Sequence, residues 1–280
     1  MVSLDMDVSI IILNYRSRGL VYQCIKTIRL YPSDCSYEII VVDNGSGDGI
    51  GDFLAERFPE VRFIDAKANL GFAAGNNLGI RASKGRYILI MNPDITVRPG
   101  SIDALVRFMD KHPDVGVAGP KLLRPNGKVD ESCYRFHRWL TPIFRRTPLG
   151  RLQSGRTEND RYVMADFDRL ESRNVDWLLG AVLIVRRSAL DKVGLLDEGY
   201  FMYFEDTDWC RRFWQDGYQV VYFVDSIMVH CHERLSAQVL WLFGPFNLAA
   251  RRHIRSAIYY FRKWGIKPIT HEELTPKVNN

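Results

Sequence analysis

Short apolar runs alternate with helical stretches through the first part of this chain of 280 residues. Such runs predict buried strands, here at residues 8–13, 38–42, 61–64, 87–91 and 115–118. Helix signals fill the intervals, with one helix ending near residue 30 and others at 51–58, 72–83 and 99–111. Strands that alternate with helices pair through crossovers, so the pattern predicts an α/β fold with a doubly wound, mostly parallel sheet.

The second part of the chain has a different pattern. Residues 124–172 are rich in Pro, Gly, Arg and aromatic residues without periodicity, and we expect an irregular excursion there. Order returns at residues 175–185, 205–215 and 218–224, and the C-terminal part is predicted to be helical up to Gly265. We expect a main domain of residues 1–234, in halves of 1–121 and 122–234, followed by a C-terminal helical extension of residues 235–280.

The placement of charge narrows the class of protein. The net charge of +5 is modest, but residues 132–157 carry six arginines and no acid, and residues 234–271 carry seven Lys or Arg and no acid. Both stretches also contain Trp or Phe, which predicts contact with an anionic or membrane-like surface.

Cysteine spacing and hydropathy indicate the compartment. The five cysteines are scattered and lack CxxC spacing, which indicates reduced thiols rather than a zinc site or disulfide framework. No apolar run approaches the ~18 residues of a membrane-spanning helix, and Asp5 and Asp7 stand where a signal peptide carries positive charge. We therefore expect a cytoplasmic protein.

Asn92-Pro93-Asp94 follows the strand predicted at residues 87–91 and is the strongest functional signal. Pro93 cannot continue a strand ladder, so Asp94 is expected beyond the strand's carboxyl end, where ligands bind in open α/β sheets. A carboxylate there could hold Mg²⁺ or Mn²⁺ against a pyrophosphate. Taken alone, the triplet is explained equally well by a turn that uses Asp after Pro.

Two other polar stretches lie at predicted element ends. Asp43 follows the strand at 38–42, where its carboxylate could accept hydrogen bonds from a nucleobase or ribose, or close an Asx turn. The glycines that follow do not match GxGxxG, and Asp43 and Asp48 would repel a pyrophosphate, so a dinucleotide-binding loop is disfavoured. Residues 69–77 are rich in Gly, Ala and Asn, which fits either a helix N-terminus that faces a ligand or an ordinary helix entry.

Glu205-Asp206-Thr207-Asp208 places three carboxylates after the aromatic run of residues 200–204. Acids cap the first turn of a helix, but aromatic neighbours also desolvate a carboxylate and raise its basicity, as a general base requires. His230 follows a strand-like run at 226–229. A lone histidine is more often structural than a ligand, and His230 becomes a candidate metal ligand only in company with Asp94.

Seven short motifs in this order resemble those of the inverting family 2 glycosyltransferases of GT-A fold, in particular the bacterial rhamnosyltransferase-like branch. The motifs lie between residues 8 and 235 and comprise Val8 to Tyr15, Val42 to Ser46, Asn69 to Phe72 with Asn77, Met91 to Asp94, Trp177 to Ala181, Tyr203 to Asp208, and His230. Each motif is weak alone, and the order of all seven carries the resemblance.

The resemblance implies a role for each motif. The nucleotide-sugar site would comprise Leu13, Asn14, Tyr15, Asp43, Asn69, Asn77, Asn92 and Asp94. Asp94 and His230 would hold a divalent metal, Mg²⁺ or Mn²⁺. The sugar and acceptor pocket would comprise Trp177, Gly180, Ala181 and Glu205, and Asp206 would be the catalytic base.

Two positions depart from the family pattern. The usual Asp-x-Asp is Asn-Pro-Asp here, so Asn92 would be a weaker ligand and Asp94 would carry more of the metal contact. Asn76 stands where many relatives have Arg, so Arg81 or the basic excursion would have to contact the phosphates.

The implied reaction moves a sugar, rhamnose or a related hexose, from a dTDP- or UDP-linked donor to a hydroxyl of a glycan or polyprenyl-diphosphate-linked acceptor, with no nucleic-acid partner. A nucleotidyltransferase of similar fold and a non-catalytic scaffold are the alternatives. The segment from Asn14 to Gly19 fits the Gly-rich loop of a nucleotidyltransferase poorly.

The predicted C-terminal helix has two unlike faces. Arg251, Arg252, Arg255, Arg262 and Lys263 share roughly one third of its circumference, and Ile254, Ala257, Tyr260, Phe261 and Trp264 lie opposite. Such a helix either lies in a membrane interface or packs its apolar face on the core. The uncharged apolar stretch at residues 239–243 favours peripheral attachment to the inner face of the cell membrane.

Overall fold

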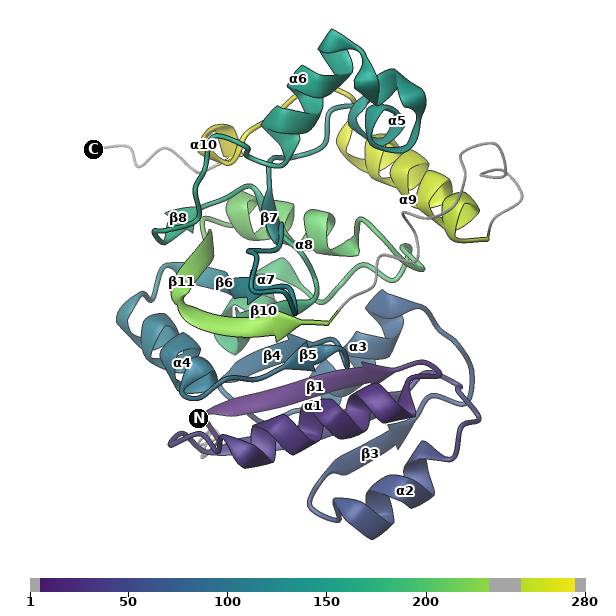
Figure 1. The fold of residues 1–280 in the computed structure, drawn as a ribbon, viewed down its shortest axis with the longest axis vertical. Coiled ribbons are helices and arrows are strands. Elements are labelled where there is room, and N and C mark those ends of the chain that lie inside the picture. The colour runs from purple at the N-terminus through teal and green to yellow at the C-terminus, as the bar shows by residue number, and fades with distance from the viewer. Residues whose placement is uncertain (1–5, 232–247, 275–280) are drawn as a thin grey trace.

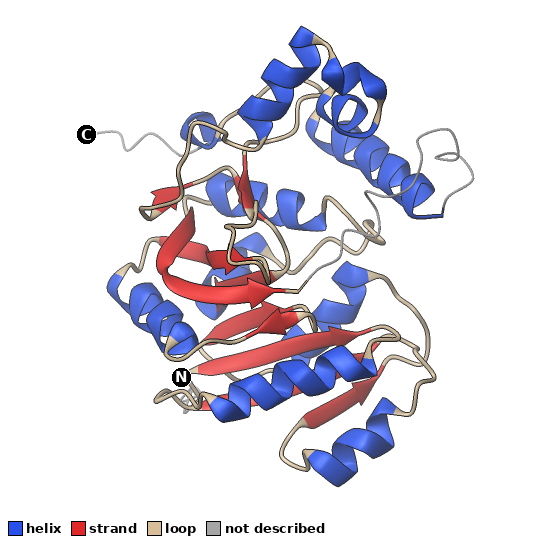
Figure 2. Ribbon diagram, viewed as in Figure 1, coloured by secondary structure: helices blue, strands red, loops and turns tan. Residues whose placement is uncertain are grey.

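The structure is a computed structural model that describes residues 6–231 and 248–274 (Figure 1). Helices flank a large central sheet, and a group of helices from the later part of the chain lies at one end of the molecule (Figure 2). The apolar stretch at residues 239–243, which favoured a membrane surface, lies outside the described residues.

Nine strands form the central sheet within the described residues. Along the main path the order is β3 (Arg62–Asp65), β2 (Tyr37–Asp43), β1 (Val8–Asn14), β4 (Tyr87–Met91), β10 (Val182–Arg186), β6 (Val115–Leu123), β11 (Gln219–His230) and β5 (Ile95–Thr96), and β8 (Arg173–Asn174) pairs with β11. The first four strands and the β6–β11 pair are parallel, whereas β10 runs antiparallel to both of its neighbours. The predicted α/β fold with a mostly parallel sheet is confirmed.

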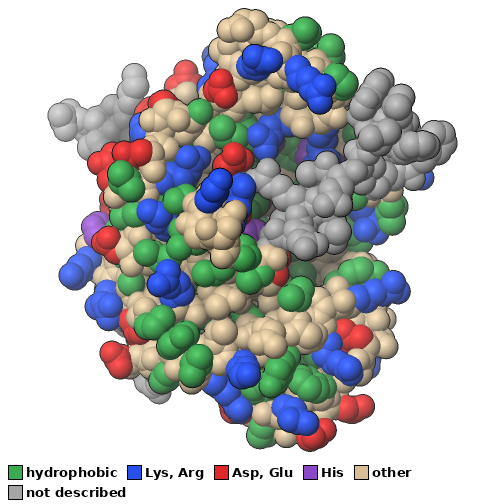
Figure 3. Space-filling view, in the orientation of Figure 1, with side chains coloured by type: hydrophobic (Ala, Val, Ile, Leu, Met, Phe, Trp, Pro, Cys, Tyr) green, Lys and Arg blue, Asp and Glu red, His purple; other side chains and the backbone are tan. Residues whose placement is uncertain are grey.

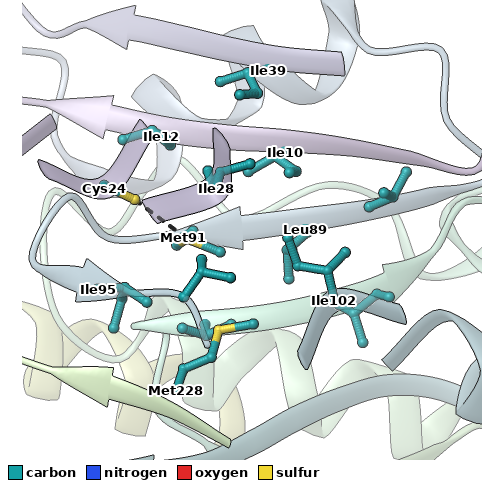
Figure 4. Close-up of a cluster of buried hydrophobic side chains, with 14 of the residues drawn as sticks. Ile10, Ile12, Cys24, Ile28, Ile39, Leu89, Met91, Ile95, Ile102 and Met228 are labelled. Carbon is teal, nitrogen blue, oxygen red and sulfur yellow. Dashed lines mark hydrogen bonds between the residues drawn. The ribbon is translucent and has the colours of Figure 1, made fainter. Parts of the chain in front are cut away.

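Helices cover both faces of this sheet. One face carries α1 (Arg18–Leu30), α2 (Ile50–Arg57) and α4 (Ser101–Lys111), and the other carries α3 (Phe72–Ala82), α7 (Leu190–Val193) and α8 (Glu205–Gln215). In β1, Ile10 and Ile12 point to the first face and Ile11 to the second, as the two-residue period of a strand requires. Figure 4 shows the buried apolar side chains on the first face, where Ile10 and Ile12 lie with Cys24. Burial on both faces explains why the strands are continuous apolar runs.

Two strands differ from their predicted form. The segment predicted at 175–185 is broken into β9 (Trp177–Leu178) and β10, with a loop between them. The runs at 218–224 and 226–229 form one strand, β11, with a register shift between Phe223 and Ile227. Because β10 and β11 come from the second half of the chain, both halves build the same sheet.

The excursion is more ordered than predicted. It contains β7 (Cys133–Tyr134), which pairs with β9, as well as α5 (Thr141–Arg146), a 3₁₀ turn at Pro148–Arg151 and α6 (Gln153–Tyr162). The prediction of an irregular segment is therefore wrong. α5 is too short for a periodic signal, and α6 is polar on most of its surface, so neither helix has the apolar stripe that sequence patterns detect.

The C-terminal helix α9 (Leu248–Trp264) packs on the body of the protein. Tyr260 is buried against Tyr200 and Phe204, with Ala257, Phe261 and Trp264 around it. Most of the predicted apolar face is thus covered by protein, not by lipid. Ile254 is the exception, because it is exposed.

The basic face of α9 is also divided. Lys263 contacts Asp197 at 2.6 Å and Asp208 at 2.8 Å, and the Arg252 guanidinium lies 4.0 Å from the ring centre of Phe201. A short helix, α10 (His271–Leu274), follows α9. Across residues 6–231 and 248–274, no helix combines the length and apolar composition needed to span a bilayer.

Lys and Arg side chains are interspersed with Asp and Glu over the face of the molecule shown in Figure 3. The excess of positive charge is therefore not concentrated into one stripe on this face.

Candidate functional site

The Asn92-Pro93-Asp94 turn lies at the carboxyl end of β4, as predicted. Its flanking residues Met91 and Ile95 point into the core (Figure 4), which anchors the turn on both sides. The backbone N–H of Asn92 donates to the carbonyl of Ala181 over 2.8 Å, and the carbonyl of Asp94 accepts from the N–H of Cys231 over 2.8 Å. The turn is thus tied both to the loop before β10 and to the end of β11.

The pairing of β5 with β11 brings Asp94 and His230 together. His230 is opposite Ile95 in the ladder, and its Nε2 lies 3.5 Å from Oδ2 of Asp94. The two predicted metal ligands lie on opposite sides of the excursion in the sequence, with 135 residues between them. In the fold they meet at one edge of the sheet.

Asp130 is a third member of this group that the sequence patterns missed. Its Oδ2 lies 3.1 Å from His230 Nδ1, and its Oδ1 accepts a 2.9 Å hydrogen bond from Arg124 Nε. Burial lowers the pKa of His230, but the carboxylates of Asp130 and Asp94 outweigh burial and raise it to about 9. The only sequence signal near Asp130 is the Pro-Asn-Gly turn at residues 125–127, which carries no functional meaning by itself.

With its pKa raised to about 9, His230 holds a proton between Asp94 and Asp130 near neutral pH, so a divalent ion such as Mg²⁺ or Mn²⁺ would have to displace the proton on Nε2 in order to bind between His230 and Asp94. A carboxylate oxygen and an imidazole nitrogen that face each other across 3.5 Å are suitably spaced to be neighbouring ligands of one ion. Asp130 holds the opposite ring nitrogen, as an outer carboxylate does for a metal-bound histidine, and so directs Nε2 toward Asp94.

A second His and acid cluster has a structural use. His271, at the start of α10, contacts the fully buried Asp176 over 2.5 Å, and exposed Glu272 lies beside it. The other oxygen of Asp176 accepts from the N–H of Phe136 over 2.6 Å. Because both oxygens of Asp176 have protein partners, we assign this cluster to fastening α10 onto the body.

The ends of β1 and β2 form the predicted nucleoside side of the site. Asp43 accepts hydrogen bonds from Asn14 Nδ2 at 2.8 Å and from the N–H of Ser46 at 3.1 Å. Asn14 is fully buried, so its side chain cannot contact a nucleoside directly and instead positions Asp43. Leu13 is partly buried and Tyr15 is 43% exposed, which leaves the Tyr15 ring available to a ligand.

The turn before α3 is shaped by Gly71. Its φ is +89°, and a Cβ there would lie 2.3 Å from the carbonyl oxygen of Phe201, so no other residue fits. The side chain of Asn69 accepts from the N–H of Gly71 over 3.0 Å and is partly exposed. This turn thereby connects the predicted nucleoside side to the segment that precedes Asp206.

Asn77 is buried in α3, where it donates to the carbonyl of Leu196 and to Glu198 and accepts from the N–H of Leu196. These hydrogen bonds tie α3 to the loop at 196–198, and the role of Asn77 in donor binding stays a prediction. Arg81, the expected phosphate contact, pairs with the same Glu198 at 3.3 Å.

Asp206 lies in the first turn of α8, as predicted. Its Oδ2 accepts from the N–H of Gly180 over 2.9 Å, and its Oδ1 accepts from the N–H of Thr207 over 2.8 Å. Burial raises the pKa of Asp206 to about 6, against the opposing effect of these two hydrogen bonds. At 8% exposure the carboxylate is desolvated but still reachable, which suits a general base.

The two neighbouring acids have different environments. Glu205 is buried, and its Oε2 has no hydrogen-bond partner among the described residues; burial, and then the charge of Asp206, raises its pKa well above the ordinary value. Asp208 is fully buried and accepts from Trp264 Nε1 at 2.7 Å and from Arg212 Nε at 2.9 Å. Asp208 is therefore a structural acid that ties α9 to α8.

The expected sugar and acceptor pocket is divided between core and site. Trp177 is buried, stacks on Tyr134 at 4.6 Å between ring centres and donates its indole N–H to the carbonyl of Arg135. Its ring is thus part of the core, and its place in the sugar and acceptor pocket stays a prediction. Gly180 and Ala181 do border the site, because they contact Asp206 and Asn92 through the backbone.

The sequence model of the family described as Glycosyl transferase family 2 matches residues 9–171, more than half of the chain. The chain belongs to glycosyl transferase family 2. The expected family is thus confirmed, and the match ends in the excursion, before the acidic motif of α8.

This family 2 chain is 34% identical over 213 residues to the N-acetylglucosaminyl-diphospho-decaprenol L-rhamnosyltransferase of Mycobacterium tuberculosis (strain ATCC 25618 / H37Rv). The match covers 69% of this chain and 66% of that protein, so it spans slightly less than two thirds of the relative. The chain is also 26% identical over 230 residues to the dTDP-rhamnosyl transferase RfbF of Shigella flexneri, which covers 80% of this chain and 71% of that protein. Both relatives agree with the expected rhamnosyltransferase-like branch.

A solved structure of GalNAc-T7 with UDP, GalNAc and Mn²⁺ superimposes on this family 2 chain with a TM-score of 0.63 at 14% identity. The superposition covers 84% of this chain and 45% of that one. At this identity the likeness concerns the fold alone, and it confirms the expected GT-A fold.

Proposed function

We propose that this chain is an inverting glycosyltransferase that moves a sugar from a nucleoside diphosphate to an acceptor hydroxyl, with Asp206 as the base. The observation that carries the proposal is the link between Asp206 and the Asn92-Pro93-Asp94 turn. Gly180 binds Asp206, and the adjacent Ala181 binds Asn92, so one loop holds the base and the donor-side turn in register.

The chemistry follows from where charge develops. When the sugar leaves, negative charge grows on the diphosphate, and a divalent ion held by Asp94 and His230 would stabilise it. The acceptor hydroxyl has a pKa far above 7 and needs a base within hydrogen-bond reach. Asp206 removes that proton, and direct attack of the oxygen on the anomeric carbon inverts its configuration without a covalent enzyme intermediate.

Burial separates the roles of the two adjacent acids. Glu205 stays protonated because charge on both neighbours would be repulsive in a desolvated site. Asp206 is then the group that ionises near neutral pH, since its backbone donors favour the carboxylate.

For the donor we propose a dTDP- or UDP-linked rhamnose or related hexose, since two relatives of this chain are named as rhamnosyltransferases. The mycobacterial relative is named for a diphospho-decaprenol acceptor, which supports a polyprenyl-diphosphate-linked acceptor here. We assign residues 1–121 to donor binding and residues 122–234 to the acceptor side.

The exposed side of α9 supports attachment of the protein to a membrane surface, where such an acceptor resides. Arg251 and Arg255 alternate with Ile254 and Ile258, which are 52% and 53% exposed, along a shallow groove of about 380 Å³. Cations beside exposed apolar side chains are the pattern of a helix that touches anionic lipid. The lipid-facing side that we propose is thus centred on Ile254 and Ile258. The aromatic residues of the predicted apolar face, Tyr260, Phe261 and Trp264, pack on the body of the protein instead.

The proposal is tested by incubating the purified chain with Mn²⁺, GlcNAc-diphosphate-lipid and each of several dTDP- and UDP-sugars, and by following nucleoside diphosphate release. Proton NMR of the product reports the anomeric configuration. Release that requires both sugar donor and acceptor, with inversion, supports the proposal. Preference for nucleoside triphosphates would indicate a nucleotidyltransferase, and no binding of any nucleotide would indicate a scaffold.

A further inference from the structure

We propose that Arg145 and Arg146, together with His137 and His253, form a site for a phosphate group carried by the acceptor. The proposal rests on the proposed function, because it places this group on the molecule whose hydroxyl reaches Asp206. None of the seven motifs that carry the family resemblance includes these four side chains.

The four basic side chains come from three separate segments and meet around the aromatic residues before α8. On α5, Arg145 lies 5.0 Å from the ring centre of Tyr162, and Arg146 lies 5.8 Å from that of Tyr203. The rings of His137, which precedes α5, and of His253, on α9, lie 4.4 and 5.1 Å from the ring of Phe204.

None of these four side chains has a carboxylate partner among the described residues, whereas other arginines of the excursion do. Arg138 and Arg161 both pair with Glu158, at 3.3 and 2.6 Å. Arg145 and Arg146 instead rest on tyrosine rings, a contact that holds a guanidinium weakly and leaves its N–H groups available.

The charges of the cluster act on one another. Burial lowers the pKa of His253 to about 3, and Arg146 lowers it further. Burial also lowers the pKa of His137, and the charges of His253, Arg145 and Arg146 lower it further. The lowered pKa values favour the neutral form of both histidines, so the positive charge of the cluster comes from Arg145 and Arg146, and an anion would pair with it.

The cluster lies against the residues that directly precede the proposed base. The ring of His137 is 4.8 Å from that of Tyr162, on which Arg145 rests, so the histidine and the arginine share one aromatic neighbour. Phe204, which contacts both histidines, immediately precedes Glu205 and Asp206. An anion bound here would therefore belong to the molecule that presents its hydroxyl to Asp206.

A phosphate is the anion that these groups recognise best. The planar guanidinium donates paired hydrogen bonds to phosphate oxygens, and two adjacent arginines match the charge of a diphosphate. Because Arg81 pairs with Glu198, the excursion is also the remaining candidate for the contact to the donor's phosphates that the sequence analysis expected. We assign the donor's diphosphate to the metal side of the site at Asp94 and His230 and this phosphate to the acceptor, and weaker binding of dTDP-rhamnose by the double variant would contradict that assignment.

The test uses inorganic pyrophosphate as probe, titrated by calorimetry in EDTA so that no metal supports the donor site. We compare the wild-type chain, the double variant Arg145→Gln/Arg146→Gln, and Arg156→Gln as a matched control. Arg156 is an exposed arginine of the same excursion, and no ion pair is formed by it within the described residues. Both variants change exposed side chains, and thermal melting checks that they remain folded.

We expect the double variant to bind pyrophosphate at least about tenfold more weakly than the wild type, and Arg156→Gln to bind equally. Equal binding by the double variant and the wild type, or no binding by the wild type, would overturn the inference. Calorimetry with dTDP-rhamnose and Mn²⁺ on the same samples keeps the two proposals apart. If the wild type binds dTDP-rhamnose and the double variant binds pyrophosphate as well as the wild type does, only the phosphate site is contradicted. If the wild type does not bind dTDP-rhamnose, the proposed function is contradicted.

The headgroup of a membrane lipid also carries a phosphate that could bind these arginines. Sedimentation with phosphatidylglycerol vesicles distinguishes a lipid phosphate from an acceptor phosphate. An acceptor phosphate site predicts that the double variant sediments like the wild type. A loss of vesicle binding as large as the loss of pyrophosphate binding would assign the arginines to lipid headgroups and contradict the acceptor site.

Discussion

The backbone N–H of Gly180 donates a 2.9 Å hydrogen bond to Oδ2 of Asp206. The next residue, Ala181, accepts from the N–H of Asn92, so the loop before β10 connects the proposed base to the turn that bears Asp94. β10 is also the strand that runs antiparallel between β4 and β6. The antiparallel insertion thus places a loop from the second half of the chain at the carboxyl ends of strands from the first half.

The first prediction concerns pH. Because the base must be ionised and burial raises the pKa of Asp206 to about 6, kcat/KM should rise with pH up to about 6 and level off above it. An unperturbed Asp would place this limb near 4. In Glu205→Gln the rise of kcat/KM should stay near pH 6, because burial and the charge of Asp206 both raise the pKa of Glu205 and favour its neutral form. A limb that moves to about 4 in this variant would show that Glu205 is charged.

The second prediction concerns stability and separates Asp208 from Asp206. Asp208 is fully buried and accepts from Arg212, Lys263 and Trp264, so Asp208→Asn removes the charge that pairs with the partly buried Arg212 and should lower the free energy of unfolding by about 2 kcal/mol. Urea unfolding measures this change. Asp206→Asn, which loses no ion pair among the described residues, is the matched control. Similar losses in both variants would contradict the division of roles.

The third prediction concerns the metal. Mn²⁺ affinity, measured by electron paramagnetic resonance in the presence of dTDP, should be lost in Asp94→Ala and weakened in His230→Ala. Asp130→Ala should weaken it by roughly 10- to 100-fold, because the ring of His230 loses its outer carboxylate.

Asp110→Asn is the control for the metal prediction, since it removes a carboxylate that pairs with Arg86 instead. Unchanged Mn²⁺ affinity in Asp130→Ala would reduce Asp130 to a structural partner of Arg124. Full activity of the wild type in EDTA would contradict metal dependence altogether.

Most strands of the first half were predictable because they are buried on both faces and read as apolar runs, whereas β3 is mostly exposed. Tyr87–Met91 is an example of the buried runs, and the break after it follows from Pro93. α5 and α6 escaped prediction because they bury too little apolar surface to leave a period in the sequence.

The sequence predicted where Asp94 and Asp206 stand in the fold, because both lie at element ends, where local signals are clear. The burial of Asn14 and Asn77, and the contact of Asp130 with His230, depend on packing between distant segments, which no local pattern records. The same applies to Lys263, which a helical wheel places with the solvated arginines but which pairs with buried Asp208.

The fourth prediction concerns α9 and lipid. Arg251→Gln/Arg255→Gln should weaken binding to phosphatidylglycerol vesicles by roughly thirtyfold, since each basic residue at an anionic surface contributes about 1 kcal/mol. The control is Arg107→Gln/Lys111→Gln, which removes the same charge from α4. Equal effects of the two double variants would indicate general attraction of charge, with no lipid-facing side on α9. Equal, negligible sedimentation of the wild type with anionic and neutral vesicles would point to a soluble acceptor.

The central claim is that Asp206 takes the proton of the acceptor hydroxyl, and one comparison tests it most directly. Asp206→Asn keeps the size of the side chain but cannot accept a proton. We predict that it binds dTDP-rhamnose and Mn²⁺ like the wild type in calorimetry, while the rate of acceptor-dependent dTDP release falls by about 10² or more. A variant that turns over at close to the wild-type rate would contradict the assignment of Asp206 as the base.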